Sequence, residues 1–286
     1  LVLLPLLSIL GEYITVPFPP IHPSMANNPA TGQPFLISEM SPGQIWSAYI
    51  RYIGAGAVLA AGLITLARTI PTIVSSARDG LKGIGTGAGG AQLRTERDLP
   101  MTFVIGGSLL LALFLALAPG LPTQGNFLVA VLIIIFGFFF VTVSSRIVGI
   151  IGSTSNPISG MTIATLMGTC MFFLLLGWSG DAYQAAALVV GAIVCISAAN
   201  AGATSQDLKT GYIVGATPIW QQTSLAIGVV TSSFVIGMTV LYMHRVFGIG
   251  SADVAAPQAT LMATLIKGLL SQNLPWGYIL VGAGLS

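Results

Sequence analysis

The sequence predicts an all-α membrane protein, a polytopic bundle of transmembrane helices. Of its 286 residues, 54% are hydrophobic and only 6% are charged, and the mean hydropathy is +0.90. A soluble globular domain carries about 25% charged residues, so this chain cannot cover a water-facing surface and must face lipid. The apolar residues also gather into runs that approach the roughly 20 residues needed to cross a bilayer.

About six complete spans are expected. They cover residues 47–70, 102–118, 127–145, 160–178, 183–199 and 223–243. Pro71 ends the first span, and Pro119 with Gly120 ends the second, because proline cannot continue a helix. Residues 1–9 indicate the tail of an earlier span, and residues 259–270 indicate an interfacial helix or half of a broken one.

Both ends of the chain are expected to be truncated. The sequence starts with an apolar run at Leu1 rather than with Met, and it stops within a new apolar segment that opens at Pro275. We therefore expect residues 1–286 to form a single transmembrane domain that is a fragment of a larger membrane protein.

The basic residues predict the orientation. The longest polar loop, residues 75–99, holds four of the ten Lys and Arg residues, namely Arg78, Lys82, Arg94 and Arg97. Because short loops rich in Lys and Arg stay in the cytoplasm, this loop is expected to be cytoplasmic. Counting spans onward puts residues 200–222 on the same side, and residues 15–42 on the opposite side.

Two polar stretches lie between predicted spans and do not fit an ordinary lipid-facing helix. The first, residues 149–161, includes Ser155, Asn156, Pro157, Ser159 and Gly160. Pro157 disfavours helix at the preceding residue, so we expect a break at Pro157 and Gly160. Broken helices build the substrate sites of many secondary transporters. The alternative is a short cytoplasmic turn whose Ser and Asn cap the next helix.

The second polar stretch, residues 199–212, is expected to break the helical pattern at Gly202 and Gly211. A polar patch in such an apolar region is costly in the bilayer unless it faces a cavity. Asn200 and Gln206 would supply polar contacts to that cavity. The alternative is a cytoplasmic loop that lies in water.

This second stretch also carries two charges, Asp207 and Lys209. Asp207 would carry a coupling proton or bind a substrate amine. Lys209 would neutralise Asp207 or bind a substrate carboxylate. Together with Asn156, Ser155 and Ser159, these side chains are the predicted substrate or proton pathway.

The sequence contains no motif for an enzyme or a metal site. It has no Walker loop, no dinucleotide fingerprint and no His–Glu pair at zinc spacing. Cys170 and Cys195 lie in apolar runs, as is typical of packing residues. We therefore expect no enzyme, no cofactor, no metal site and no nucleic-acid partner, and a transporter of this kind would be secondary rather than ATP-driven.

Three motifs belong together: Ser155-Asn-Pro-Ile-Ser-Gly-Met-Thr162, Asn200-Ala-Gly-Ala-Thr-Ser-Gln-Asp-Leu-Lys-Thr-Gly-Tyr212, and Tyr52-Ile-Gly-Ala-Gly-Ala57 followed by Arg68-Thr-Ile-Pro71. They resemble the bacterial branch of the oligopeptide transporter family, which also includes the plant yellow stripe-like carriers of metal chelates. The resemblance covers residues 52–222, and the Gln-Asp-Leu-Lys-Thr-Gly stretch is its most specific part.

The resemblance implies a multi-pass protein of the bacterial cytoplasmic membrane that takes up peptides or metal-chelate complexes with protons. It implies that the break at Asn156, Pro157 and Gly160, and the turn at Asp207 and Lys209, line or gate the pathway. Many members have an acidic residue where this chain has Ala203, and its loss weakens the case for siderophore or nicotianamine-like chelates. We expect a proton-coupled oligopeptide symporter, with chelate uptake and a passive channel or pore as the alternatives.

Overall fold

A computed structural model describes residues 2–18, 28, 32–61, 64, 67–68, 71, 74–75, 93–118, 126–251, 254–270 and 275–285. Within these residues every regular element is a helix, which confirms the predicted all-α fold. The chain divides into two compact units, residues 62–272 and residues 1–61 with 273–286. The expectation of one transmembrane domain over residues 1–286 stays a prediction.

Among its described residues, the larger unit contains five helices that are long and apolar enough to cross a membrane. They are α4 (Met101–Leu117, preceded in the chain by a 3-10 turn at Arg94–Glu96), α5 (Phe127–Ile151), α6 (Ile158–Leu175, preceded by a 3-10 turn at Ser153–Ser155), α7 (Asp181–Val214) and α8 (Pro218–Phe247). These helices confirm five of the six expected spans. The remaining one, residues 47–70, lies partly outside the described residues.

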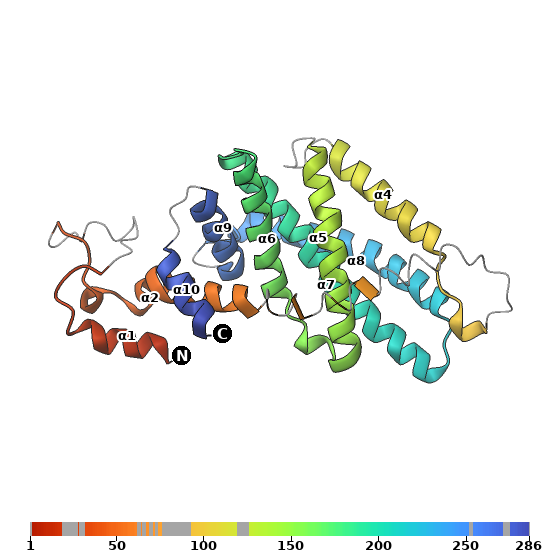
Figure 1. Cartoon of the computed structure of the whole chain (residues 1–286), viewed down its shortest axis with the longest axis horizontal. Helices are drawn as coiled ribbons and strands as arrows, with labels where there is room; N and C mark the ends of the chain where they lie inside the picture. The colour runs from red at the N-terminus through yellow and green to blue at the C-terminus, as the bar shows by residue number, and fades with distance from the viewer. Residues whose placement is uncertain are drawn as a thin grey trace. The chain divides into compact units, whose positions relative to one another are not determined.

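The core of the larger unit lies among α5, α6 and α7, which lie side by side (Figure 1). α6 is the most buried of the three, and Thr165, Thr169, Cys170 and Phe173 have no accessible surface. The buried threonine hydroxyls donate to carbonyls one turn back in the same helix, because a polar group without a partner is costly away from water.

The segment at 259–270 forms α9 (Pro257–Leu270), which packs against α6 and α7. Its buried residues, Met262, Leu265, Ile266 and Leu269, recur at helical spacing and form one apolar face. At 1.5 Å per residue its 14 residues rise only about 21 Å, so α9 is too short to cross the hydrocarbon core.

The helical path is interrupted between α5 and α6, where the sequence predicts a break. Gly152 follows the end of α5 with φ +116°, a conformation that glycine tolerates best, and Pro157 lies directly before α6. Gly160, in contrast, is buried inside the first turn of α6. The break therefore lies at residues 152–157, and Gly160 serves packing.

α7 corrects the predicted break at Gly202 and Gly211, because its 34 residues form one continuous helix through both glycines. A glycine inside a helix costs only about 1 kcal/mol, which tertiary packing offsets. A Cβ on Gly202 would lie within 3 Å of Ser144, Val148 and Asn156 side chains. The two glycines allow close approach, and the polar stretch extends the fifth span by 15 residues, from 199 to 214.

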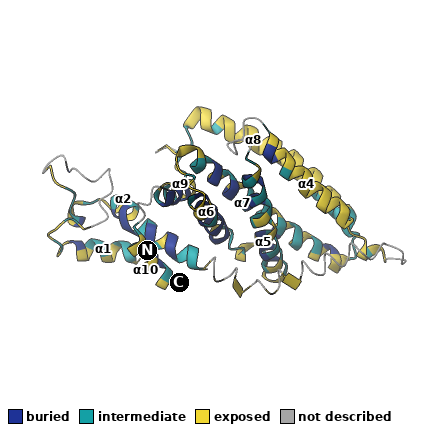
Figure 2. Cartoon of the chain, turned by 45° about the horizontal axis from the view of Figure 1, so that its top comes forward, coloured by how far each residue is buried: buried dark blue, intermediate teal, exposed yellow. Residues whose placement is uncertain are grey.

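α4 and α8 cover little of this core. Figure 2 shows both helices mostly exposed, and every residue of α8 from Ala226 to Tyr242 is exposed. These residues are predominantly apolar, so the surface of α8 suits lipid or other transmembrane helices.

The smaller unit contains α1 (Leu3–Gly11), a 3-10 turn at Ile37–Glu39, and a helical stretch that begins with α2 (Pro42–Ile45). That stretch continues through a π-helix at Trp46–Ile50 and α-helical residues 51–61. It starts five residues before the expected 47 because Ser41 and Gln44 form a capping box around Pro42.

The last element, α10 (Trp276–Leu285), crosses residues 53–57 at very close range. A Cβ on Gly56 would lie 2.0 Å from the Ile279 carbonyl oxygen, and one on Gly282 would lie 1.9 Å from the Ile53 carbonyl oxygen. Small residues at such crossings let two backbones touch, which drives helix association in membranes.

We predict that Gly56→Ala destabilises the protein and that Gly54→Ala does not. The two glycines are two residues apart in one helix, but a Cβ on Gly54 meets nothing within 4 Å. Overpacking at Gly56 should cost about 1–3 kcal/mol, whereas alanine at Gly54 gains helix propensity. Thermal unfolding of the detergent-purified variants measures this difference. Equal unfolding midpoint temperatures for the two variants would contradict the close crossing of α10 over residues 53–57.

Candidate functional site

The predicted site residues of α7 lie on two different faces of that helix. Successive helical residues are about 100° apart, so Gly202 and Lys209 share one face. Asp207 and Gly211 share another, and Asn200 lies on the Asp207 face, seven residues before it. The first face meets α5, and the second faces α8.

The face toward α5 is held by short polar side chains, which we call the α5–α7 seam. Ser144 Oγ donates to the Ala198 carbonyl, and Ser145 Oγ donates to the Ala201 carbonyl at 3.3 Å. In return, Ser205 Oγ of α7 donates to the Ser145 carbonyl of α5 at 2.9 Å. These bonds run in both directions between the helices and fix their register.

Asn156 joins the helix break to this seam. Its Nδ2 donates to Ser144 Oγ at 2.8 Å and lies against Gly202. Its buried Oδ1 has no hydrogen-bond partner among the described residues. The two polar stretches that the sequence singled out therefore meet at Asn156 and Gly202.

Lys209 belongs to the seam and not to Asp207. Its Nζ donates to the Gly149 carbonyl of α5 at 2.7 Å. Residues two apart on a helix point about 200° from each other and do not face one another. The prediction that Lys209 partners Asp207 is therefore corrected, because that prediction assumed a turn where the chain is helical.

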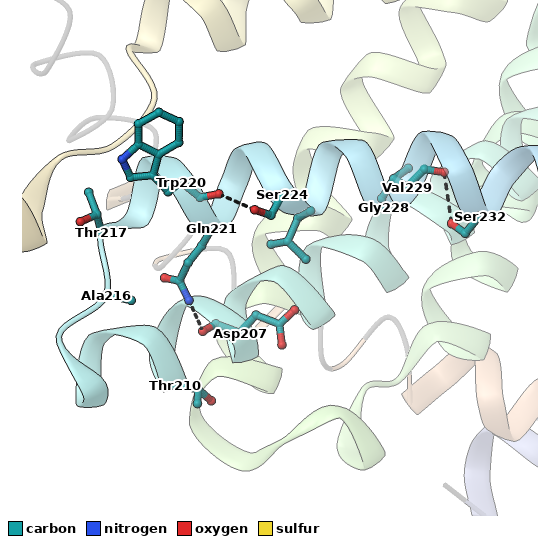
Figure 3. A pocket seen from close by; sticks show the side chains of 11 residues that line it. Asp207, Thr210, Ala216, Thr217, Trp220, Gln221, Ser224, Gly228, Val229 and Ser232 are labelled. Carbon is teal, nitrogen blue, oxygen red and sulfur yellow. Dashed lines mark hydrogen bonds between the residues drawn. The ribbon is translucent and has the colours of Figure 1, made fainter.

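The face toward α8 opens into a groove of about 740 Å³, the α7–α8 groove (Figure 3). Its lining comes from the last turns of α7, the turn at Gly215–Thr217 and the first half of α8: Asp207, Thr210, Ala216, Thr217, Trp220, Gln221, Ser224, Leu225, Gly228, Val229 and Ser232. The walls are mostly apolar with a few polar groups, as is usual for sites that bind small molecules.

Asp207 supplies the one acidic side chain among these lining residues. Its backbone carbonyl accepts from Gln221 Nε2 at 3.3 Å, and the same Gln221 side chain lies against Gly211. A side chain at Gly211 would collide with Gln221, so the glycine lets α8 approach α7 here. The exposed Asp207 carboxylate is left available to a ligand in the groove.

The polar residues of α8 that line this groove were not predicted from the sequence. Thr217, Gln221, Ser224, Gly228 and Ser232 follow one another at intervals of three or four residues. That spacing puts them on one face of a helix. This spacing can be read from the sequence. It was missed because the span was expected to start at residue 223, which left out Thr217 and Gln221.

A segment at residues 94–99, the 94–99 strap, holds the α7–α8 turn. Arg94 donates through Nη1 to Thr217 Oγ1 and through Nη2 to the Gly215 carbonyl, both at 2.8 Å. Gln222 accepts from the Leu99 N–H at 3.0 Å and donates to Asp98 Oδ1 at 3.1 Å. The strap and the turn were both expected to be cytoplasmic, and the structure brings them together.

The length of α7 places the groove near one end of the membrane. Its 34 residues rise about 51 Å, which exceeds a hydrocarbon core of about 30 Å. A helix that enters the core at the charged Asp181 has crossed it by about residue 201. Asp207 then lies about 9 Å past the core and the turn about 20 Å past it, and Gly228 and Ser232 lie back toward the core.

The other predicted site residues form no further cluster. Ser155 lies in the turn between α5 and α6, Ser159 in the first turn of α6, and Asn200 and Gln206 on α7; all four are exposed. Within the described part of the chain, no group of three His, Cys, Asp or Glu side chains is arranged to hold a metal ion.

Comparison with known proteins gives two matches at the level of sequence. Residues 1–286 match the family described as "OPT oligopeptide transporter protein". A Haemophilus influenzae protein named "Putative oligopeptide transporter" is 29% identical over 271 residues, which cover 84% of this chain and 43% of that protein. The chain thus spans less than half the length of this relative. No solved structure matches the chain.

We predict that Gln222→Ala loosens the 94–99 strap. The change removes hydrogen bonds to Asp98 and Leu99, each worth about 0.5–1.5 kcal/mol. Trypsin should therefore cleave after Arg97 about 5 to 150 times faster, because cleavage follows the population of the open form. Gln206→Ala, an exposed glutamine on α7, is the control and should leave the cleavage rate unchanged. Equal rates for wild type and Gln222→Ala would refute the strap.

Proposed function

Since this chain belongs to the OPT oligopeptide transporter family, we propose that it forms part of a secondary transporter that carries oligopeptides together with protons. We place it in the bacterial cytoplasmic membrane, because the relative at 29% identity is bacterial and the family is one of transporters. Family members are transporters rather than enzymes, which agrees with the missing enzyme motifs. The described part of the chain alone holds five helices long and apolar enough to cross a membrane, which makes this a multi-pass membrane protein.

The observation that carries the proposal is the Asp207 carboxylate in the α7–α8 groove. A peptide offers a cationic amine, backbone donors and acceptors, and side chains of varied size. Asp207 would bind the amine, and the hydroxyl and amide groups of Thr217, Gln221 and Ser224 would bind the peptide backbone. The ring of Trp220 would pack against apolar side chains of the peptide, whatever their shape.

Proton coupling requires a group whose charge differs between the two halves of the transport cycle. In symport the proton and the peptide must be bound together while the site changes its exposure. Asp207 would therefore either bind the peptide amine while a second group carries the proton, or carry the proton while the hydroxyl and amide groups of the groove hold the peptide. The groove lies at the end of α7 that is expected to be cytoplasmic, which suits a release site.

The direct test is uptake by the protein reconstituted into sealed proteoliposomes. Under an imposed inward proton gradient, mixed short peptides should acidify the interior. Asp207→Asn keeps the size of the side chain but removes its charge, and it should lower the rate of acidification at least about tenfold, the effect of losing about 1.4 kcal/mol.

Asp181→Asn is the matched control, because it makes the same change at the opposite end of the same helix. It should retain wild-type acidification. Gradient-driven uptake that persists in Asp207→Asn would remove Asp207 from the mechanism. Acidification with iron or zinc chelates alone would favour the metal-chelate alternative, and uptake of labelled peptide without acidification would favour a passive pore.

A further inference from the structure

An arginine of the smaller unit lies in the second turn of a segment expected to span the membrane. Arg51 follows the π-helix Trp46–Ile50, within the segment expected to form the first span. It is only partly exposed, and its Nε is buried with no hydrogen-bond partner among the described residues. Ionisable groups inside spans are costly, so one that persists there indicates a ligand or a partner.

The π-helix explains the position of the Arg51 side chain. The Arg51 N–H donates to the Trp46 carbonyl, five residues back. In an α-helix residues five apart point about 140° from each other, but the wider π-turn aligns them. The Arg51 Cζ thus lies 4.8 Å from the centre of the Trp46 ring. Single π-turns are rare and occur frequently at functional sites.

This stacking leaves the edge of the guanidinium free for a ligand. Trp46 covers one flat face and fixes the plane through a cation–π contact. The donors that remain lie in the plane of the guanidinium, and the buried Nε lacks a hydrogen-bond partner among the described residues. A planar fork of N–H donors matches the two oxygens of a carboxylate.

Two polar side chains of the smaller unit are engaged elsewhere. Glu39 accepts from Asn28 Nδ2 at 3.0 Å and from the Leu36 N–H at 3.2 Å. Tyr49, two residues before Arg51, donates its hydroxyl to the Phe18 carbonyl at 2.7 Å and packs its ring against Tyr278. Both side chains therefore have other partners, and Arg51 Nε has none among the described residues.

We propose that Arg51, oriented by Trp46, binds the C-terminal carboxylate of the transported peptide. The choice of a peptide rests on the proposed function, and the choice of an oxyanion rests on Arg51 itself. By the predicted orientation, Arg51 lies one turn inside the extracytoplasmic end of its span. The site therefore selects peptides with a free C-terminus as they enter.

The test measures binding rather than uptake. Thermal stabilisation of the detergent-purified protein is titrated with trialanine and with trialanine amide, which lacks the carboxylate. The wild type should bind trialanine about tenfold more tightly, as expected for a charge-assisted hydrogen-bonded pair. In Arg51→Gln this ratio should fall to about one, with the affinity for the amide unchanged. Arg68→Gln, an exposed arginine of the same expected span, should keep the wild-type ratio.

Arg51→Lys covers the case in which Arg51→Gln fails to fold, because lysine keeps the charge but loses the planar fork. Its ratio should fall severalfold, and an unchanged ratio in either variant overturns the inference. Equal binding of acid and amide by the wild type, with stabilisation by phosphatidylglycerol only when Arg51 is present, would assign Arg51 to a lipid phosphate and also overturn it.

The outcome separates this inference from the proposed function. A wild type that prefers the free acid but does not acidify proteoliposomes contradicts proton-coupled uptake and supports the carboxylate site. A wild type that takes up acid and amide with equal affinity supports transport and overturns the carboxylate site.

Discussion

The larger unit depends on how α7 packs against α5. The bilayer offers no partners for polar groups, so a polar helix face must find them within the protein. Ser144, Ser145 and Ser205 do this by donating to carbonyls of the opposite helix. Short side chains and Gly202 let the two backbones approach closely enough for those bonds.

This packing decides which side of α7 remains for function. Gly202 and Lys209 are occupied by α5, so Asp207, on another face, is turned toward α8. The break between α5 and α6 contributes to the same packing through Asn156, which joins Ser144. The break therefore supports the structure around the groove and does not line it.

The groove itself depends on a second set of contacts. Gly211 lets Gln221 reach the backbone of Asp207, and the 94–99 strap ties the start of α8 to the turn. Beyond these contacts α8 is exposed along its length (Figure 2). Polar contacts thus hold α8 at one end, and the apolar surface along the rest of the helix suits lipid or other transmembrane helices.

The sequence by itself determined the membrane class, the all-α fold and five of the spans, because composition and the length of apolar runs follow from the thickness of the bilayer. It also identified the family through motifs at Asn156 and Asp207. It did not determine the course of the 199–212 stretch, where polar residues and two glycines suggested a loop. Only the tertiary structure decided that point, because neighbouring helices supply the partners that make a polar helix stable. Likewise, the sequence did not determine whether Asp207 neighbours Lys209 or the groove residues of α8. That depends on which face of α7 meets which helix.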